Sequence, residues 1–332
     1  PEFNVKKIYA DAYKQVSIGS AQRYYEVKEA FNTAFNYGAL VINYSGHGGE
    51  LGLGHENYLD IPQINAWENK NKLPLFITAT CEFSRFDDPA RQSAGEYVML
   101  HPKGGAIAML TTVRLVYSWP NKQLNTNFYN NNAFELNGGD RPSIGEIYMK
   151  TKNATGASVN ARSFTLLGDP ALVLAYPKHK VLTTEMKNLH NGVETDSFNA
   201  LSVVNASGEV RDHSGNLLSD FNGEVDVTVY GSKQTLKTLK NDPGSHIQEF
   251  EAYKSLIYKG KVSVKSGKFN YNFIIPRDVP IESGLGKISY YAQNGITDAN
   301  GYETLFISPQ EDSNAGVDFT GPSVRVFMND TT

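Results

Sequence analysis

The sequence has very little cysteine: Cys81 is the single thiol in 332 residues. One thiol cannot form an intramolecular disulfide, and it cannot supply the ligands of a cysteine-based zinc site. No run of 18 or more apolar residues occurs, so no segment has the length of a membrane-spanning helix. The formal net charge of −4 gives no reason to expect nucleic acid or an anionic membrane as a partner.

The first half of the chain alternates helical and strand-like patterns. Residues 21–36 carry apolar side chains at nearly helical spacing and precede Gly38, which predicts a helix. Continuous apolar runs of strand length lie at 39–44, 75–80 and 105–110. Runs that are apolar on both faces indicate buried strands, so residues 1–178 are predicted to form a mostly parallel α/β sheet with helices on both faces. Residues 164–167 and 171–175 are predicted to be its last two strands.

The pattern changes after Pro177. Short segments with alternating apolar residues, separated by Asn and Gly turns, predict an all-β, immunoglobulin-like sandwich over residues 179–315. A new strand-like run near 323 suggests that residues 316–332 begin a further β-domain and that the chain is a fragment. Asp and Asn residues at 296–300 hint at a calcium loop, although acidic turns without metal are commoner. We expect no other cofactor or metal.

Polar residues follow the first two apolar runs. His47 lies in a Ser-Gly-His-Gly-Gly segment after the first run, and Cys81 directly follows the second. Ligands of parallel sheets bind beyond the carboxyl ends of the strands. The 34-residue separation suits one crossover connection between neighbouring strands, so we expect His47 and Cys81 at the same sheet edge.

Each residue alone has a simpler interpretation. A lone cysteine that closes an apolar strand is most often a small core residue, and a histidine between glycines can cap a turn. As a pair, they suit nucleophilic catalysis, because an imidazole can take the thiol proton and later return it to a leaving amine. The N–H groups of Gly48 and Cys81 would then stabilise the tetrahedral oxyanion.

Two segments resemble the motifs of the gingipain-type cysteine peptidases, a caspase-like clan: residues 43–50 with His47, and residues 77–81 with Cys81. Residues 168–172 resemble the segment that closes the catalytic domain in that family. The resemblance covers residues 4 to about 178 well and the following β region loosely. It implies a caspase-like α/β fold, a catalytic pair of Cys81 and His47, and oxyanion donors at Gly48 and Cys81.

The same family suggests further substrate-pocket residues. Tyr117 falls where gingipains place an aromatic pocket wall, although a core aromatic is as reasonable. Arg114, on the same segment, would meet an acidic or polar substrate group, although a solvated surface arginine is the commoner outcome. Glu82 and Glu50 flank the pair and are candidates to orient His47, whereas exposed glutamates are usual.

Residues 81–96 are similar to a narrower sortase branch of the type IX secretion system. That branch implies removal of C-terminal signal domains from secreted cargo and transfer of the new carboxyl end to an amine of anionic lipopolysaccharide. It also implies contact with other type IX secretion components and a place at the outer membrane, on the cell surface of a Gram-negative bacterium. Gingipain-type enzymes carry a preceding subdomain that supplies an acid to the histidine. We expect it before Pro1, which would leave this fragment with reduced activity.

Two alternatives remain open from the sequence. The protein would be an ordinary secreted gingipain-like protease if water resolves the thioester. It would be a catalytically silent binding module if the α/β part only docks a partner, although the presence of both His47 and Cys81 argues against this.

Overall fold

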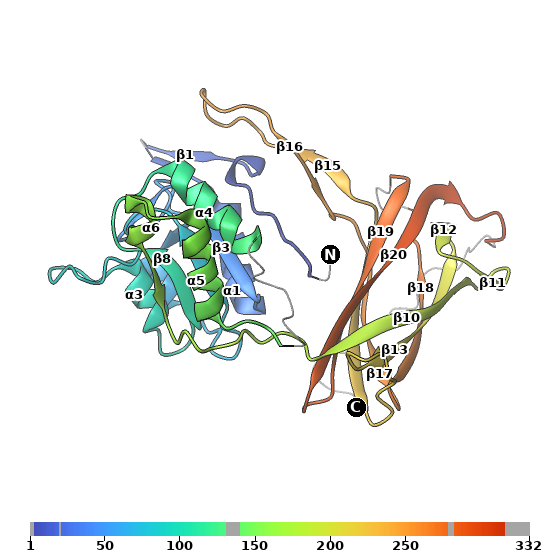
Figure 1. The fold of residues 1–332 in the computed structure, drawn as a ribbon. Coiled ribbons are helices and arrows are strands. Elements are labelled where there is room, and N and C mark those ends of the chain that lie inside the picture. Colours follow the sequence, from blue (N-terminus) through green and yellow to red (C-terminus); the bar gives the residue numbers. More distant parts are fainter. Residues whose placement is uncertain (1–2, 20, 131–139, 278–281, 316–332) are drawn as a thin grey trace, which may run out of the picture. The chain divides into compact units, whose positions relative to one another are not determined.

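The structure is a computed structural model that describes residues 3–19, 21–130, 140–277 and 282–315 (Figure 1). It divides into two compact units, which we name by their composition. The α/β unit contains residues 7–176 and, from later in the chain, 237–249. The β unit contains residues 177–236 and 250–315 with the N-terminal residues 3–6. The further β-domain predicted at 316–332 lies outside the described residues.

A four-stranded sheet in the order β3-β7-β8-β9 forms the centre of the α/β unit. β3, β7 and β8 run parallel, and β9 is antiparallel to β8. Every residue of β7 and β8 is buried, as expected for a sheet covered on both faces. The strands are β3 (Val41–Ser45), β7 (Leu75–Ala79), β8 (Ala108–Thr112) and β9 (Phe164–Leu167).

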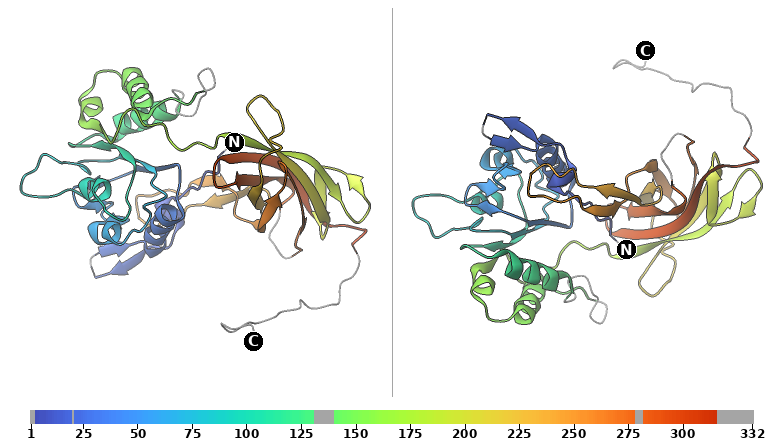
Figure 2. Two further views of the ribbon diagram at one scale, coloured as in Figure 1. Left: turned by 90° about the horizontal axis from the view of Figure 1, so that it is seen from below. Right: turned by 90° about the horizontal axis from the view of Figure 1, so that it is seen from above.

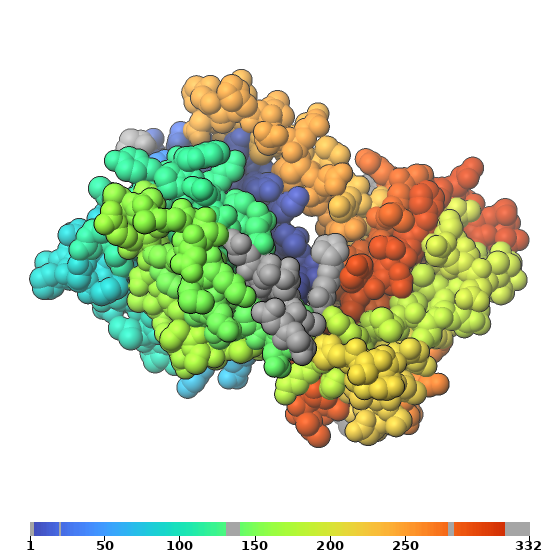
Figure 3. Space-filling view, in the orientation of Figure 1, coloured from blue at the N-terminus to red at the C-terminus, as the bar shows by residue number. Residues whose placement is uncertain are grey.

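Helices cover both faces of this sheet, as the sequence predicted. Two views show α1 on one side of the sheet and α4 to α6 on the other (Figure 2), and α4 and α5 cover their face in the space-filling view (Figure 3). Phe31 and Phe35 of α1 share a core with Phe76 of β7, whereas Leu124 of α4 packs with Ala79. The helices are α1 (Tyr25–Tyr37), α2 (Ile61–Asn65), α3 (Ala94–Met99), α4 (Ser118–Asn130), α5 (Ile144–Thr155) and α6 (Val159–Ser163). None of the described helices is long and apolar enough to span a bilayer.

Short elements surround the sheet. They are η1 (Ala10–Ala12), the β1–β2 pair (Val16–Ile18, Ala21–Arg23) and a three-stranded sheet of β4 (Gly48–Gly49), β5 (Gly52–Leu53) and β6 (Leu59–Asp60). β2 occupies the start of the segment predicted as helical from 21 to 36, so α1 begins only at Tyr25.

Of the two strands predicted at the end of the α/β unit, the first is present as β9, and the prediction of the second is wrong. Residues 171–175 form no strand. Instead, the carbonyls of Pro170 and Leu172 accept the N–H groups of Gly145 and Ile144, at 2.8 Å each. These N–H groups belong to the first turn of α5, which has no acceptors for them within the helix, so the segment serves as a cap rather than as a sheet strand.

The β unit is built on one nine-stranded sheet with the path β17-β14-β19-β20-β10-β13-β18. β11 pairs with β10, and β12 pairs in parallel with β20. The strands are β10 (His179–Asn188), β11 (Val193–Glu194), β12 (Ser197–Ala200), β13 (Val203–Arg211), β14 (Gly223–Tyr230), β17 (Leu256–Val264), β18 (Lys268–Ile274), β19 (Gly284–Gln293) and β20 (Asp298–Glu311). Two further strands, β15 (Gln234–Lys237) and β16 (Glu249–Ala252), pair with each other in a separate two-stranded sheet.

Alternate residues of these strands form a single apolar core. β13 shows strict alternation of buried and half-buried positions, and Val204, Val227 and Ile288 from three different strands belong to the same cluster. A tight turn at Lys265–Lys268 joins the two end strands of the path, β17 and β18. The region is thus β-rich, and its immunoglobulin-like nature stays a prediction.

Candidate active site

The ladder between β3 and β7 places the two predicted catalytic residues at equivalent positions. Ser45 pairs with Ala79 at the carboxyl end of this parallel ladder. His47 and Cys81 each lie two residues beyond that pair, and the Gly46 N–H still donates to the Ala79 carbonyl at 3.4 Å. Both residues therefore leave the sheet at the same edge of two neighbouring strands.

The backbone of His47 is held by two donors, while its side chain is exposed. Its carbonyl accepts the Tyr44 hydroxyl at 2.6 Å and the Gly54 N–H at 2.8 Å. Burial raises the pKa of Tyr44 far above its ordinary value, so the phenol stays protonated and donates. The imidazole stacks on that of His55, with ring centroids 5.7 Å apart. The ring is thus presented to solvent from a fixed backbone.

Cys81 is half-buried rather than a core residue. Its Sγ lies 3.4 Å from the Val116 carbonyl, which accepts from the thiol in place of the imidazole. Hydrogen bonds hold the chain on both sides of it, from the Thr112 hydroxyl to the Thr80 carbonyl and from the Glu82 N–H to the Arg114 carbonyl. The thiol therefore lies against the segment that follows β8, on a well-anchored turn.

Glu82 adopts a backbone conformation that is unusual for a residue with a side chain. Its φ of 48° lies in the left-handed region, which costs an L-residue about 1–3 kcal/mol and tends to occur at functional sites. This conformation turns the chain sharply directly after Cys81. The glutamate itself is half-buried.

The Gly48 N–H is free to act as a donor, as its strand register shows. Gly48 pairs with Leu53, and the Gly54 N–H donates to the His47 carbonyl. In an antiparallel ladder this pattern makes Gly48–Leu53 a non-hydrogen-bonded pair, whose own N–H and carbonyl groups point away from the partner strand. A β-carbon on Gly48 would lie 2.7 Å from the Thr80 Oγ1, so the backbone here approaches the residue before Cys81 closely.

The predicted pocket residues have different surroundings. Arg114 forms a two-point ion pair with Asp87, with Nη1–Oδ1 at 2.9 Å and Nη2–Oδ2 at 2.5 Å. Its guanidinium holds the pKa of the Asp87 carboxyl below the ordinary value. Tyr117 is 76% exposed, and its backbone is bound on both sides by the Asn160 side-chain amide. Glu50 pairs with Arg85 rather than with His47.

Three residues beside the site had no distinguishing feature in the sequence. His55 packs on His47 from across the β4–β5 hairpin, and Leu115 and Trp119 are 69% and 70% exposed on the segment that touches the thiol. Exposed large apolar side chains beside a reactive group suggest a binding surface. No sequence pattern reveals these three residues, because the exposure of a side chain depends on the tertiary structure.

In the part of the chain that the structure describes, no metal-ligand cluster accompanies these residues. Within the described ranges, no three His, Cys, Asp or Glu side chains gather as a metal would require. In the turn at 296–300, the Asp298 carboxylate accepts the Lys178 N–H at 3.2 Å and the Tyr291 hydroxyl at 3.1 Å. The calcium loop stays a prediction, and the described residues contain no cluster of ligands that supports it.

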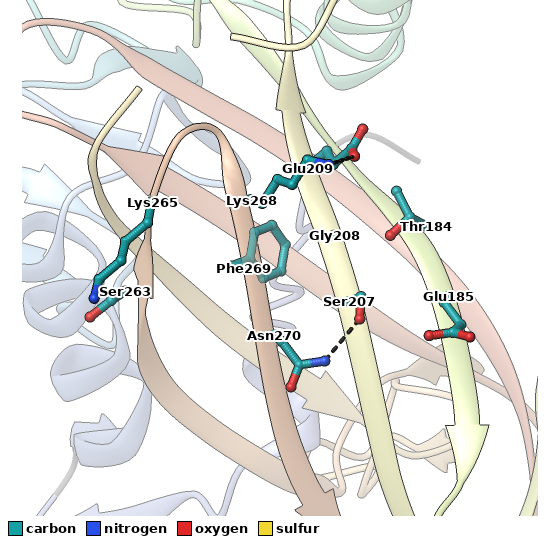
Figure 4. Close-up of a pocket in the computed structure, with 10 residues that line it drawn as sticks. All are labelled: Thr184, Glu185, Ser207, Gly208, Glu209, Ser263, Lys265, Lys268, Phe269 and Asn270. Carbon is teal, nitrogen blue, oxygen red and sulfur yellow. Dashed lines mark hydrogen bonds and ion pairs between the residues drawn. The ribbon is translucent and has the colours of Figure 1, made fainter. Parts of the chain in front are cut away.

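A shallow groove of about 590 Å³ lies on the β unit, across β10, β13, β17 and β18 (Figure 4). Its most buried charge, Glu209, is neutralised by Arg211 at 2.7 Å and Lys268 at 3.5 Å. The Asn270 amide likewise donates to Ser207 at 2.8 Å. Because these polar groups satisfy one another, the groove indicates no ligand.

Comparison with known proteins gives one family and several solved structures. The model of peptidase family C25 matches residues 1–175. Latent PorU from Porphyromonas gingivalis is 28% identical, over 70% of this chain and 22% of that one, with a TM-score of 0.41. The Arg-specific cysteine proteinase gingipain R is 15% identical, over 88% of this chain and 57% of that one, with a TM-score of 0.42. No curated protein matches.

The chain spans about a fifth of the length of the PorU structure and just over half of gingipain R. The family match covers more than half of this chain and includes both His47 and Cys81. Together with an α/β sheet covered on both faces, it identifies the kind of protein. The chain belongs to peptidase family C25, the gingipain family of cysteine peptidases.

Proposed function

We propose that Cys81 is the nucleophile and His47 the general base of a cysteine endopeptidase. One observation supports this most strongly: both residues lie two positions beyond the last pair of the β3–β7 ladder, where Cys81 is only half-buried. Parallel strands carry their reactive groups at this carboxyl edge. In a core cysteine the thiol would instead be enclosed.

The proposed reaction begins when the Cys81 thiol turns from the Val116 carbonyl to His47 and transfers its proton to the imidazole. The thiolate attacks the scissile carbonyl, and the N–H groups of Gly48 and Cys81 bind the oxyanion of the tetrahedral intermediate. Collapse of that intermediate breaks the C–N bond, the His47 imidazolium protonates the leaving amine, and a thioester remains on Sγ. A second nucleophile then attacks the thioester, and the thiolate leaves.

The identity of that second nucleophile separates a sortase from a protease. We propose a sortase reaction, in which an amine of surface lipopolysaccharide resolves the thioester after removal of a C-terminal signal domain from secreted cargo. The proposed enzyme acts at the outer membrane, on the cell surface, with other type IX secretion components. The motif around residues 81–96 supports this branch. The alternative, a secreted gingipain-like protease, uses water at the same step.

The substrate pocket in this proposal uses the segment after β8 together with Glu82. Tyr117 offers an exposed aromatic face, and Arg114 lies on the same segment with its charge balanced by Asp87. Glu82 flanks the dyad directly after Cys81, whereas the carboxylate of Glu50, which the sequence also placed in the pocket, is held by Arg85 and Arg91. Replacement of Tyr117 by Ala should raise KM more than it lowers kcat, because a pocket wall binds substrate without taking part in bond cleavage.

Product analysis tests the proposed reaction. The full-length protein is incubated with a peptide that spans a cargo cleavage site and with an amine acceptor, and the products are identified by mass spectrometry. An amide-linked product supports the sortase. Hydrolysis alone supports the protease, and the absence of any cleavage, with the protein folded, contradicts both enzyme proposals.

A further inference from the structure

Glu50 links the two loops that carry the proposed catalytic residues. It lies three residues after His47, in the turn between β4 and β5, and its side chain is only 12% exposed. Its Oε1 lies 2.8 Å from Arg85 Nη1, and its Oε2 lies 3.3 Å from Arg91 Nη1. A largely buried carboxylate with two cationic partners is a specific arrangement, since glutamates are usually exposed.

Both partners of Glu50 belong to the loop that follows Cys81. Arg85 also approaches the Glu82 carboxylate, at 3.7 Å, directly beside the nucleophile. A backbone bond adds to this link, because the Glu50 carbonyl accepts the Ala94 N–H at 2.6 Å. The contacts of this one residue therefore connect the His47 loop to both ends of the Cys81 loop.

The Glu50 link adds to the two hydrogen bonds at the His47 carbonyl, in a loop whose glycine-rich backbone is permissive. Five glycines fall within nine residues of this loop: Gly46, Gly48, Gly49, Gly52 and Gly54. The β3–β7 ladder ends at Ser45–Ala79, so no strand pairing joins His47 directly to Cys81. Glycine-rich segments have many accessible conformations, and a displacement of about 1 Å between reacting groups can cost about a hundredfold in rate.

We propose that Glu50 is a positioning residue, which sets the separation of His47 and Cys81 through its ion pairs with Arg85 and Arg91. The inference rests on the proposed catalytic role of the Cys81–His47 pair. It differs from the role first expected for Glu50, direct contact with His47, because its carboxylate oxygens are occupied by the two arginines. Glu50 acts on the geometry of the pair and not on the substrate.

Alkylation of the Cys81 thiol, measured as a function of pH, tests the positioning role of Glu50 without a peptide substrate. The 332-residue chain has one cysteine, so its reaction with iodoacetamide reports Cys81 alone. A thiol paired with an imidazole forms thiolate at lower pH than an ordinary thiol with a pKa near 8.5. We expect Glu50→Gln to slow alkylation at about pH 6.5 by roughly tenfold or more, and to leave the rate near pH 9.5 unchanged.

Matched variants separate positioning from stability. Ser143→Ala removes the cap of α5, where Ser143 accepts the Glu146 N–H, and should lower the melting temperature without changing the alkylation profile. The charge swap Glu50→Lys with Arg85→Glu should recover most of the rate that either single change loses. Arg85→Gln repeats the test from the other loop if Glu50→Gln does not fold.

The outcomes distinguish this inference from the proposed function. If His47→Ala shifts the alkylation profile and the Glu50 and Arg85 variants do not, the positioning role is wrong and the dyad stands. A charge swap that stays as slow as the single variants also overturns the positioning role. If His47→Ala leaves the profile unchanged, the dyad itself is wrong.

Discussion

Two adjacent glycines in the His47 loop differ in what surrounds them. A β-carbon on Gly48 would lie 2.7 Å from Thr80 Oγ1 and 3.1 Å from the Gly52 carbonyl, whereas one on Gly49 would meet no atom within 4 Å. We expect Gly48→Ala to cost about 1–3 kcal/mol of stability, as overpacking does. It should also slow labelling of Cys81 by a peptidyl inhibitor about tenfold, because the loop must move away from Thr80.

Gly49→Ala is the control and should change both quantities little. Thr80→Ala removes the two side-chain atoms nearest the new methyl group, and its Oγ1 has no hydrogen-bond partner in the described structure. Combining it with Gly48→Ala should therefore restore part of the stability. Equal effects of Gly48→Ala and Gly49→Ala would show that this close approach is unimportant.

Among single residues, those that directly follow a strand could be predicted from the sequence. The residues that contact them from other loops could not. His47 and Cys81 follow apolar runs, which form the half-buried end strand β3 and the buried strand β7, so their common sheet edge was visible in the sequence. The Val116 carbonyl against the thiol, the His55 ring on His47 and the Arg85 partner of Glu50 come from other loops. No local pattern encodes such contacts between separate loops.

At the scale of elements, residues 237–249 belong to the α/β unit although the chain around them belongs to the β unit. Asp11 in η1 holds this segment: its carboxylate accepts the N–H groups of Lys240 and Asn241 and the Asn241 amide, at 2.8–3.2 Å. Leu239 is 54% exposed, so apolar burial contributes little there. Polar contacts must supply most of the local stability.

Asp11→Ala should therefore loosen this segment. Removal of these acceptors should cost about 1–3 kcal/mol locally, and amide hydrogen exchange at 240 and 241 should become roughly ten- to a hundredfold faster. Asp11→Asn keeps one acceptor oxygen and should have a smaller effect. Exchange that is unchanged in Asp11→Ala would mean that other contacts hold the segment.

The sequence predicted the larger elements of the α/β unit because each has its own periodicity. The helix before Gly38 and the three parallel strands are confirmed, with α1 starting later because β2 pairs with β1. Residues 171–175 are apolar enough for a strand, but they cap α5 instead. The excursion of 237–249 depends on a side chain more than 200 positions earlier, which no periodicity can reveal.

At the scale of the whole molecule, we expect the stability of the β unit to fall at acid pH because of one carboxylate, that of Asp312. Asp312 is only 6% exposed and accepts Asn188 at 2.6 Å, Ser202 at 3.0 Å and His190 at 3.1 Å. Burial alone would raise its pKa, but hydrogen bonds from Asn188, the Asn314 backbone, His190 and Ser202 outweigh burial and lower it well below the ordinary value.

A pKa lowered by folding contributes stability that is complete above the unfolded value, near 4, and is lost as the pH falls further. Thermal melting of the β unit should therefore shift to lower temperature below about pH 4. Asp312→Asn should lower the melting temperature at neutral pH and weaken this acid dependence. Asp220→Asn, at an exposed carboxylate, should change neither; equal behaviour of the two variants would contradict the assignment.

The most direct test of the whole account is covalent labelling of the full-length protein by a peptidyl chloromethyl ketone, followed by intact-mass and peptide analysis. We expect one adduct, on Cys81, which is absent in Cys81→Ala and forms much more slowly in His47→Ala. A folded protein that is not labelled anywhere between about pH 5 and pH 9, or an adduct whose rate does not depend on His47, would contradict the cysteine–histidine dyad.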